Sequence, residues 1–473
     1  MRKLVSAGLL CAALLCGCGA QKQSDGSAEY QLTINSMPEM AQTETEQYTR
    51  SAAAYQDTLR ASEDYGMLLP YKQLIVQADG STVERYALAD QNGAIVTDAV
   101  YDSVSVETAG KYELYVLTQK QGSQAQTTCA ALDGSWVIGP FYGSAEMTES
   151  GIITREYTNK GSWRGSHLFD ANGKTVVKTE DEILFCQDGT MLCRKAGKEE
   201  EYVWQKLDGT LLTSFRAEEV GAPADGYVIA RDESGCGVLD ENGEWVIAPV
   251  YQSLEGRFGS YLIAQNADGK YGILRIDGKT IQEFEYTKIQ LCDNTAPLYQ
   301  LWTEDKSIVV NAANGKRYAI PSGITTQEIV GLQQTGHAVQ TEDMAIVFDD
   351  IASFELKNVS ALHEIGRKTV VAQAEDALYL VHLDSSAKSE AIPYVYCEPE
   401  ITDALQNNTF TVRDPETGRQ GIMADSGKFV LQPIYHEINV IADGYYQVRT
   451  AQFTGVVDKN GEWIVKLRNA AED

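Results

Sequence analysis

Residues 238–251 read Val-Leu-Asp-Glu-Asn-Gly-Glu-Trp-Val-Ile-Ala-Pro-Val-Tyr, and this stretch decides the fold. Asn-Gly between two runs of β-forming residues is a strong hairpin signal, because the turn needs a positive φ that glycine adopts without steric cost. The side chain of Asp240 is placed to accept hydrogen bonds from the amides of the turn. Pro249 has no N–H, so it belongs where the second strand leaves its ladder. The stretch therefore predicts two antiparallel strands joined by a tight turn.

The same pattern recurs along most of the chain. Good copies occupy residues 132–142 and 423–435, a last copy begins at Asp458, and weaker copies begin at Asp90, Asp170, Asp208, Asp277 and Asn314. The turn glycines stand at positions 93, 134, 173, 209, 243, 278, 315, 427 and 461. The 368 residues from the first to the last make ten steps of about 37 residues, a constant phase that marks tandem repeats. Two worn copies are therefore expected in the long gap, at Asp349-Asp350 and at Asp384-Ser385-Ser386.

Each repeat has room for three or four short strands and no helix. In the best copy, residues 237–240 precede the turn as a second strand, and residues 226–230 form a third. Units that cannot bury their own faces must stack on their neighbours. We therefore predict an all-β fold of tandem antiparallel repeats over residues 66–468, arranged as a propeller-like ring or ring pair, with an open superhelix of β-hairpins as the alternative. A ring pair would divide into two lobes, 66–290 and 291–468.

The two ends of the array suggest how it closes. It begins with a half-unit that contains Pro70-Tyr71 and ends with Trp463-Ile464-Val465, which lacks the usual Pro and Tyr. We expect a late strand to complete an early sheet, which would leave few open strand edges.

These motifs resemble the WG-repeat family, whose unit reads approximately Gly-aromatic-Ile-Asp-x-x-Gly-x-Trp-Val-Ile-x-Pro-x-Tyr. The resemblance covers about residues 66–467 and is weakest between about 290 and 415. The Trp that precedes the strand glycine in the family is missing, and those positions hold Cys236, Tyr271, Gln420 and Thr454. The resemblance implies a β-rich interaction or scaffold module and brings no catalytic residues with it.

The N-terminus has the features of an export signal. Residues 1–17 carry Arg2 and Lys3, then an apolar run too short to span a bilayer as a helix. Leu15-Cys16-Gly17-Cys18 resembles the bacterial lipobox, which implies cleavage before Cys18 and a diacylglycerol on its sulfur; an ordinary signal cleaved nearby is the alternative. Residues 18–39 read as a flexible tether and residues 40–62 as a helical spacer. The expected location is the exported face of a bacterial cell membrane, held there by lipid alone.

Net charge and cysteine content limit the possible partners and bear on whether disulfides form. The 473 residues include 39 basic and 67 acidic side chains, a net charge of −28. Such a chain lacks the basic face that nucleic acid needs. Six cysteines lie beyond the signal, an even number that permits disulfides in an exported protein, although their strand-like surroundings favour buried free thiols: Cys129, Cys186, Cys193, Cys236, Cys292 and Cys397.

The sequence offers no catalytic motif, so we predict no catalytic, cofactor-binding or metal-binding residues, and no cofactor. The histidines have no metal-ligand spacing and read as surface or turn residues: His167, His337, His363, His382 and His436. The repeated tyrosines read as packing residues rather than a sugar-stacking platform: Tyr142, Tyr251 and Tyr435. Acidic clusters could supply a glycosidase pair, but a solvated surface is the simpler reading.

A site is expected where the repeat rule breaks. Two stretches qualify, Tyr157 to His167 and the region around Trp302 and His363 to His382. The predicted function is a lipid-anchored, non-catalytic binding or scaffold module for protein or glycan. The alternatives are a propeller-type enzyme acting on envelope polysaccharide and a structural spacer without a specific ligand.

Overall fold

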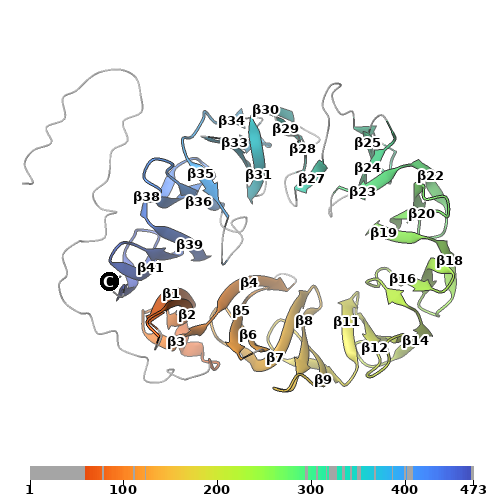
Figure 1. Ribbon diagram of the computed structural model, residues 1–473, viewed down its shortest axis with the longest axis horizontal. Helices are drawn as coiled ribbons and strands as arrows, with labels where there is room; N and C mark the ends of the chain where they lie inside the picture. The colour runs from red at the N-terminus through yellow and green to blue at the C-terminus, as the bar shows by residue number, and fades with distance from the viewer. Residues whose placement is uncertain are drawn as a thin grey trace, which may run out of the picture. The chain divides into compact units, whose positions relative to one another are not determined.

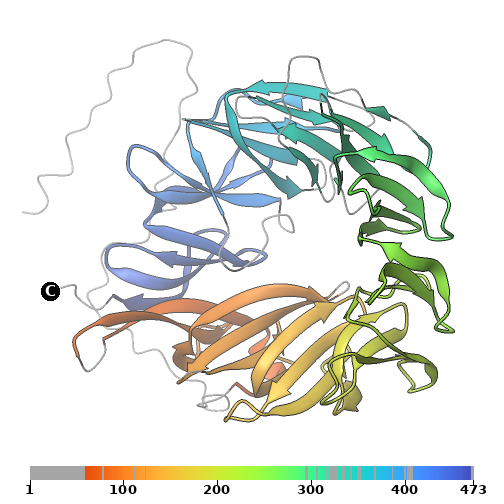
Figure 2. The same cartoon turned by 45° about the vertical axis from the view of Figure 1, so that its right-hand side comes forward.

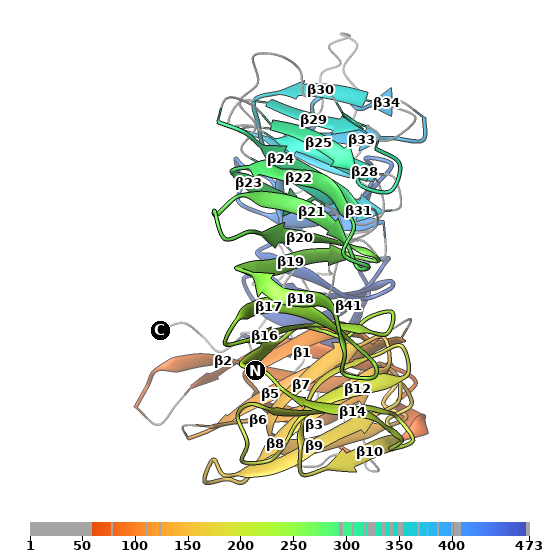
Figure 3. The same cartoon turned by 90° about the vertical axis from the view of Figure 1, so that its right-hand side faces the viewer.

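The computed structural model describes residues 59–469, apart from 77–78, 110–111, 123, 293–296, 305–306, 316, 319–327, 333–335, 341–343, 349–352, 367–368, 376, 386, 399–400 and 402–407. Within these residues the chain forms ten antiparallel sheets, numbered here from first to tenth in chain order. All-β tandem repeats, predicted from the hairpin motif, are confirmed. Figure 1 shows the sheets following one another along the chain, and Figure 3 shows the fifth, β19–β22, as one such unit.

The first five sheets contain β1 to β22. Their strands are, in the first sheet, β1 (Leu68–Val76), β2 (Thr82–Asp90) and β3 (Ile95–Tyr101); in the second, β4 (Ser103–Ala109), β5 (Tyr112–Gln121), β6 (Gln124–Ala131), β7 (Val137–Thr148), β8 (Gly151–Tyr157), β9 (Trp163–Phe169) and β10 (Thr175–Thr179); in the third, β11 (Glu182–Gln187), β12 (Thr190–Arg194), β13 (Glu201–Lys206) and β14 (Leu211–Arg216); in the fourth, β15 (Glu219–Val220), β16 (Tyr227–Asp232), β17 (Gly235–Asp240) and β18 (Trp245–Tyr251); and in the fifth, β19 (Ser253–Phe258), β20 (Tyr261–Gln265), β21 (Tyr271–Arg275) and β22 (Thr280–Tyr286).

The last five sheets contain β23 to β42, with four strands each. Their strands are, in the sixth sheet, β23 (Lys288–Leu291), β24 (Leu298–Trp302), β25 (Ser307–Asn311) and β26 (Arg317–Tyr318); in the seventh, β27 (Glu328–Leu332), β28 (Gly336–Gln340), β29 (Met344–Phe348) and β30 (Ser353–Lys357); in the eighth, β31 (Val359–Gly366), β32 (Thr369–Ala374), β33 (Leu378–His382) and β34 (Ala387–Lys388); in the ninth, β35 (Val395–Cys397), β36 (Thr409–Arg413), β37 (Gln420–Ala424) and β38 (Phe429–Tyr435); and in the tenth, β39 (Glu437–Ala442), β40 (Tyr445–Arg449), β41 (Phe453–Asp458) and β42 (Trp463–Arg468).

The predicted hairpin turns join the last two strands of a repeat. All nine turn glycines have φ between 71° and 86°, and the N–H of each donates to a backbone carbonyl oxygen three or four residues earlier. In the deciding stretch, Asp240 Oδ1 accepts from the backbone N–H of Asn242 and of Glu244, both at 2.9 Å. The worn copy at Asp384-Ser385 joins β33 to β34, as predicted. Asp349-Asp350, between β29 and β30, lies outside the described residues.

In the best copy a glycine also stands in the strand before the turn, where it allows close packing within the sheet. A Cβ on Gly237 of β17 would lie 2.7 Å from the Trp245 ring and 2.5 Å from the carbonyl oxygen of Ile247, both on β18. Only a residue without a side chain therefore lets the Trp ring lie flat on the neighbouring strand. This contact explains why the repeat pairs a strand glycine with a Trp or Phe after the turn.

The second sheet combines two repeats because they share β7. Residues Val137 to Tyr142 of β7 pair with β6, and Tyr142 to Thr148 pair with β8. Figure 2 shows this sheet in orange to yellow. In the fourth sheet, by contrast, the strand ends at the corresponding tyrosine, Tyr251 of β18, and Ser253 begins β19 of the next sheet.

The first and last sheets pack against each other. One buried cluster combines Leu68, Leu69 and Val96 of the first sheet with Val456 and Val465 of the tenth. The Thr454 hydroxyl of β41 donates to the backbone oxygen of Lys72 on β1, and Figure 1 shows these strands side by side. This end-to-end contact agrees with the propeller-like arrangement and not with an open superhelix.

The predicted exchange of a strand between the ends is wrong. The tenth sheet has four strands of its own, and the first has three, with no ladder to the tenth among the described residues. Pro70 and Tyr71 are not a leftover half-unit, because both lie within β1 and pair with Leu88 and Ala87 of β2. Burial of apolar side chains, rather than shared backbone hydrogen bonds, closes the array.

The N-terminal predictions fall mostly outside the described residues. The export signal, Cys18, the tether and residues 40–58 of the helical spacer all lie there. Residues 59–62 are not helical, and a short 3-10 turn, η2 (Glu63–Tyr65), follows them. Among the described residues, no helix has the length and apolar character needed to cross a membrane. The division into two lobes stays a prediction.

Candidate binding cavity

The repeat is most irregular at the start of the fourth sheet. Its first strand, β15, has two residues, whereas the first strands of the other sheets have three to nine. Pro223 lacks the N–H that would continue the ladder, and the chain then turns at Asp225 and Gly226, both with positive φ. A space between the fourth and fifth sheets lies beside this short strand.

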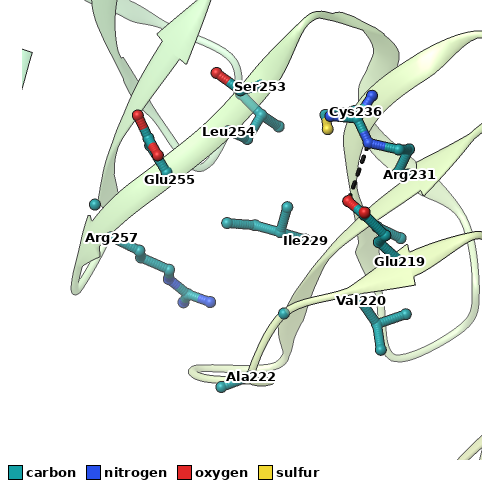
Figure 4. A pocket seen from close by; sticks show the side chains of 13 residues that line it. Glu219, Val220, Ala222, Ile229, Arg231, Cys236, Ser253, Leu254, Glu255 and Arg257 are labelled. Atoms are coloured by element: carbon teal, nitrogen blue, oxygen red, sulfur yellow. Dashed lines mark hydrogen bonds and ion pairs between the residues drawn. The ribbon is translucent and has the colours of Figure 1, made fainter.

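This space is a cavity of about 460 Å³. One wall comes from β15 and β16 of the fourth sheet and the other from β19 of the fifth (Figure 4). The lining is apolar at Val220, Ile229 and Leu254, and charged at its ends, where Figure 4 shows Arg231 with Glu219 on one side and Arg257 with Glu255 on the other. A cavity of this size and mixed lining suits a side chain or a single sugar ring.

Arg257 is fixed by the backbone of the irregular segment. Its guanidinium donates to the carbonyl oxygens of Ala224 at 2.6 Å and of Tyr227 at 3.3 Å, and it pairs with Asp225 at 3.3 Å. Burial lowers the pKa of Arg257, and the negative charge of Asp225 opposes this effect. Arg257 therefore ties β19 to the segment after β15 and holds the cavity in shape.

The opposite end is fixed by a second arginine. Arg231 Nε lies 3.2 Å from Glu219 Oε2, and Arg231 Nη2 donates to the carbonyl oxygen of Gln252 at 2.7 Å. Cys236 lines the same wall, and burial raises the pKa of its thiol, which disfavours the reactive thiolate. The two arginines thus fix both ends of the cavity.

The prediction that the histidines are surface or turn residues is partly wrong. His167, His363 and His382 are half-buried within strands rather than surface or turn residues, whereas His436 is exposed between β38 and β39. His337 lies on β28, where the side chains are outside the described residues. No cluster of three or more potential metal ligands occurs among the described residues.

Two histidines pair with carboxylates. His167 Nδ1 lies 3.3 Å from Glu156, and His363 Nδ1 lies 3.0 Å from Glu398. Burial lowers the pKa of both histidines, and the partner carboxylates oppose this effect. His363 also stacks on Tyr396, with ring centroids 3.8 Å apart, so its position is explained by packing between the eighth and ninth sheets.

The irregular stretches named from the sequence do not line the cavity. Tyr157 to His167 forms the end of β8, a hairpin and part of β9, whereas Trp302 ends β24. His363 to His382 spans β31 to β33 of one sheet. The overlooked segment is residues 219–226, where Gly221, Pro223 and Gly226 interrupt the first strand of a repeat, and this interruption was the available clue.

The repeated tyrosines differ in their surroundings. Tyr435 is fully buried, and Tyr251 is half-buried and stacks on Phe284 of β22 with centroids 5.8 Å apart. Both pack within or between repeats. Tyr142 is also half-buried, and its neighbours across the strands are Gln126 of β6 and Tyr157 of β8.

The six cysteines of the array are free thiols, and all but Cys397 are buried. Burial raises the pKa of Cys129 and of Cys193 to about 12, which suppresses their reactivity. They act as small apolar core residues, the reading that their sequence context favoured.

Comparison with known proteins supports the repeat. Two segments, residues 237–271 and 421–451, match the family model described as WG containing repeat. These are the two best copies of the motif, and in both the strand glycine begins the match. No curated protein matches the chain.

Solved structures resemble the fold at low similarity. A eukaryotic initiation factor structure has a TM-score of 0.39 at 9% identity and covers 77% of this chain and 95% of its own. Kluyveromyces lactis Hsv2p has a TM-score of 0.30 at 11% identity, covering 68% and 96%, and apo AztD from Citrobacter koseri has 0.29 at 11%, covering 71% and 96%. Such likenesses say nothing about a ligand.

Proposed function

We propose that this chain is a non-catalytic binding module, held by lipid at Cys18 on the exported face of a bacterial envelope, with protein or glycan as its partner. The observation that carries the proposal is the cavity between the fourth and fifth sheets, with its apolar middle and charged ends. Arg231 and Arg257 each hold backbone carbonyl oxygens, so the cavity is shaped before a ligand arrives.

Binding accounts for the lining better than catalysis on polysaccharide does. Glu219, one of the two carboxylates at the cavity, forms an ion pair with Arg231 at 3.2 Å, which holds it at the wall. Burial disfavours the thiolate of Cys236, the thiol of the same wall. An ion-paired carboxylate and a buried thiol fit the positioning of a ligand better than catalysis.

The cavity is tested with a soluble chain of residues 19–473 and an envelope extract divided into protein and glycan fractions. Ala222 is exposed and lines the cavity, so Ala222→Trp fills it without altering the core. We expect saturable retention by the wild-type chain and at least tenfold weaker retention by this variant. Ala196→Trp, in an exposed hairpin of the third sheet, is the matched control and should bind normally.

Two results would contradict the proposal. Absence of saturable retention from either fraction would leave a structural spacer as the better account. New reducing ends in the glycan fraction, released by the wild-type chain, would favour the enzyme.

The lipid anchor is tested by labelling cells with palmitate. We expect the label to enter the wild-type chain and Cys16→Ala, and to be lost from Cys18→Ala, because only the residue at the cleavage site carries acyl chains. Two or more acyl chains are enough to hold a protein stably on a membrane. Label that persists in Cys18→Ala would show that the anchor is elsewhere.

A further inference from the structure

Three aromatic side chains lie next to one another across the second sheet. Tyr142 of β7 pairs with Tyr157 of β8, and Tyr157 pairs with Trp163 of β9. Directly opposed residues of antiparallel strands project from the same face of a sheet. Tyr157 and Trp163 are in contact, with centroids 5.3 Å apart and planes at 74°. We call Tyr142, Tyr157 and Trp163 the aromatic row.

The aromatic row is accessible. The Tyr157 side chain is 37% exposed, one of the most exposed large hydrophobic residues of the described chain, and the other two members are half-buried. What distinguishes Tyr157 from other exposed rings is its contact with a second aromatic ring, Trp163, which makes a continuous aromatic surface.

The hairpin beside the row holds it in place. Trp163 Nε1 donates to the carbonyl oxygen of Glu180 at 2.7 Å, which fixes the indole and leaves only the ring for other contacts. Within the hairpin, the Thr158 hydroxyl accepts from the backbone N–H of Ser162 at 3.1 Å, and Gly161 N–H donates to Thr158 O at 2.9 Å. A ligand would therefore meet ordered rings at a low entropic cost.

Amide side chains continue the row on the other side. Gln126 of β6 pairs with Tyr142, and Gln119 of β5 pairs with Gln126; both are half-buried. Neighbouring strands lie about 4.8 Å apart, so five side chains in register span about 20 Å. The order is two hydrogen-bonding amides followed by three rings, at a spacing close to the length of one pyranose unit.

We propose that this surface binds an uncharged chain of 1,4-linked, N-acetylated amino sugars. The C–H faces of pyranose rings pack on aromatic rings, and hydroxyl and acetamido groups bond with the Gln amides. The net charge of −28 disfavours polyanionic chains as ligands. The inference rests on the proposed binding function but places this ligand on a surface separate from the cavity, with no residue in common.

The probe is the β-1,4-linked hexamer of N-acetylglucosamine, titrated calorimetrically into the soluble chain of residues 19–473. We expect saturable binding that weakens at least tenfold in Tyr157→Ala and little in Trp163→Phe, which keeps a ring. The matched control is Tyr112→Ala, an exposed tyrosine on β5 of the same sheet, which should bind as the wild type does. A polygalacturonate of similar length should not bind.

Several outcomes would overturn the inference. They are no binding of the hexamer by the wild-type chain, equal binding by Tyr157→Ala, or a proline-rich peptide that binds in place of the hexamer and is lost in Tyr157→Ala. The cavity variant Ala222→Trp should bind the hexamer normally. If the hexamer fails while Ala222→Trp still loses an envelope partner, this inference is wrong and the proposed function stands; if both tests fail, both are wrong.

Discussion

A chain that ends at Asn460 is expected to lose the fold of the first sheet together with the missing strand. The truncation removes β42, and with it Val465, which is fully buried in a cluster with Leu68 and Val96 of the first sheet. The turn at Gly93 also packs directly on the backbone of Ile464. Deleting a buried strand exposes the apolar faces on both sides of it, so we expect a loss of at least about 5 kcal/mol in local stability.

Hydrogen exchange is the measurement for this truncation, because it reports the stability of each sheet separately. We expect the amides of β1 and β2 to exchange at least a hundredfold faster than in the full chain. The fifth sheet, which has no contact with the removed strand, is the internal control. Unchanged protection of β1 and β2 would show that the two ends of the array fold independently.

Glu437→Gln is expected to destabilise the same contact between the first and tenth sheets, because it removes a negative charge there. Glu437 of β39 pairs with Lys72 of β1 and with Arg449 of β40, each at 2.7 Å. The Lys72 and Glu437 side chains are 14% and 12% exposed, so water can solvate the Lys72 ammonium only weakly once the carboxylate is gone. Removal of one partner of a fully buried pair costs about 3–5 kcal/mol, because it leaves uncompensated charge. Here Glu84 remains 3.9 Å from Lys72 and 3.5 Å from Arg449 and offsets part of their charge, so we expect a cost of about 1–3 kcal/mol.

The effect of Glu437→Gln is measured by urea unfolding together with hydrogen exchange of the first and tenth sheets. Glu200→Gln is the matched control, because Glu200 pairs with Arg216 in the third sheet and both side chains are more than half exposed. Exposed pairs contribute about 0–1 kcal/mol, so the control should unfold near the wild-type midpoint. Equal effects of the two substitutions would show that the Lys72–Glu437 pair stabilises the protein no more than an exposed ion pair does.

The sequence was sufficient to predict the repeat unit because a hairpin turn is specified locally. Asp240, Gly243 and Trp245 lie within six residues, and their turn chemistry depends on little else in the chain. The regular spacing then located the worn copy at Asp384-Ser385, where the motif itself is hard to recognise. Free buried cysteines were also predictable, since short apolar runs around Cys186 and Cys193 form strands whose side chains face a core.

Contacts between distant residues were not predictable in the same way. The closure of the array depends on Val465 packing near Leu68, about four hundred positions away in the sequence, and no local pattern records that contact. The cavity lies beside the two-residue strand β15 and is lined on its other side by β19 of the next sheet. The aromatic row required the strand register, which places Tyr142 opposite Tyr157 and Tyr157 opposite Trp163.

Because the first and tenth sheets meet through side chains and exchange no strand, every sheet is made from one continuous length of chain. Gene duplication can therefore add a whole unit, or recombination can delete one, without rerouting any other part of the backbone. A circular permutant with a linker between the present ends and new ends in an exposed turn should retain the native circular dichroism spectrum.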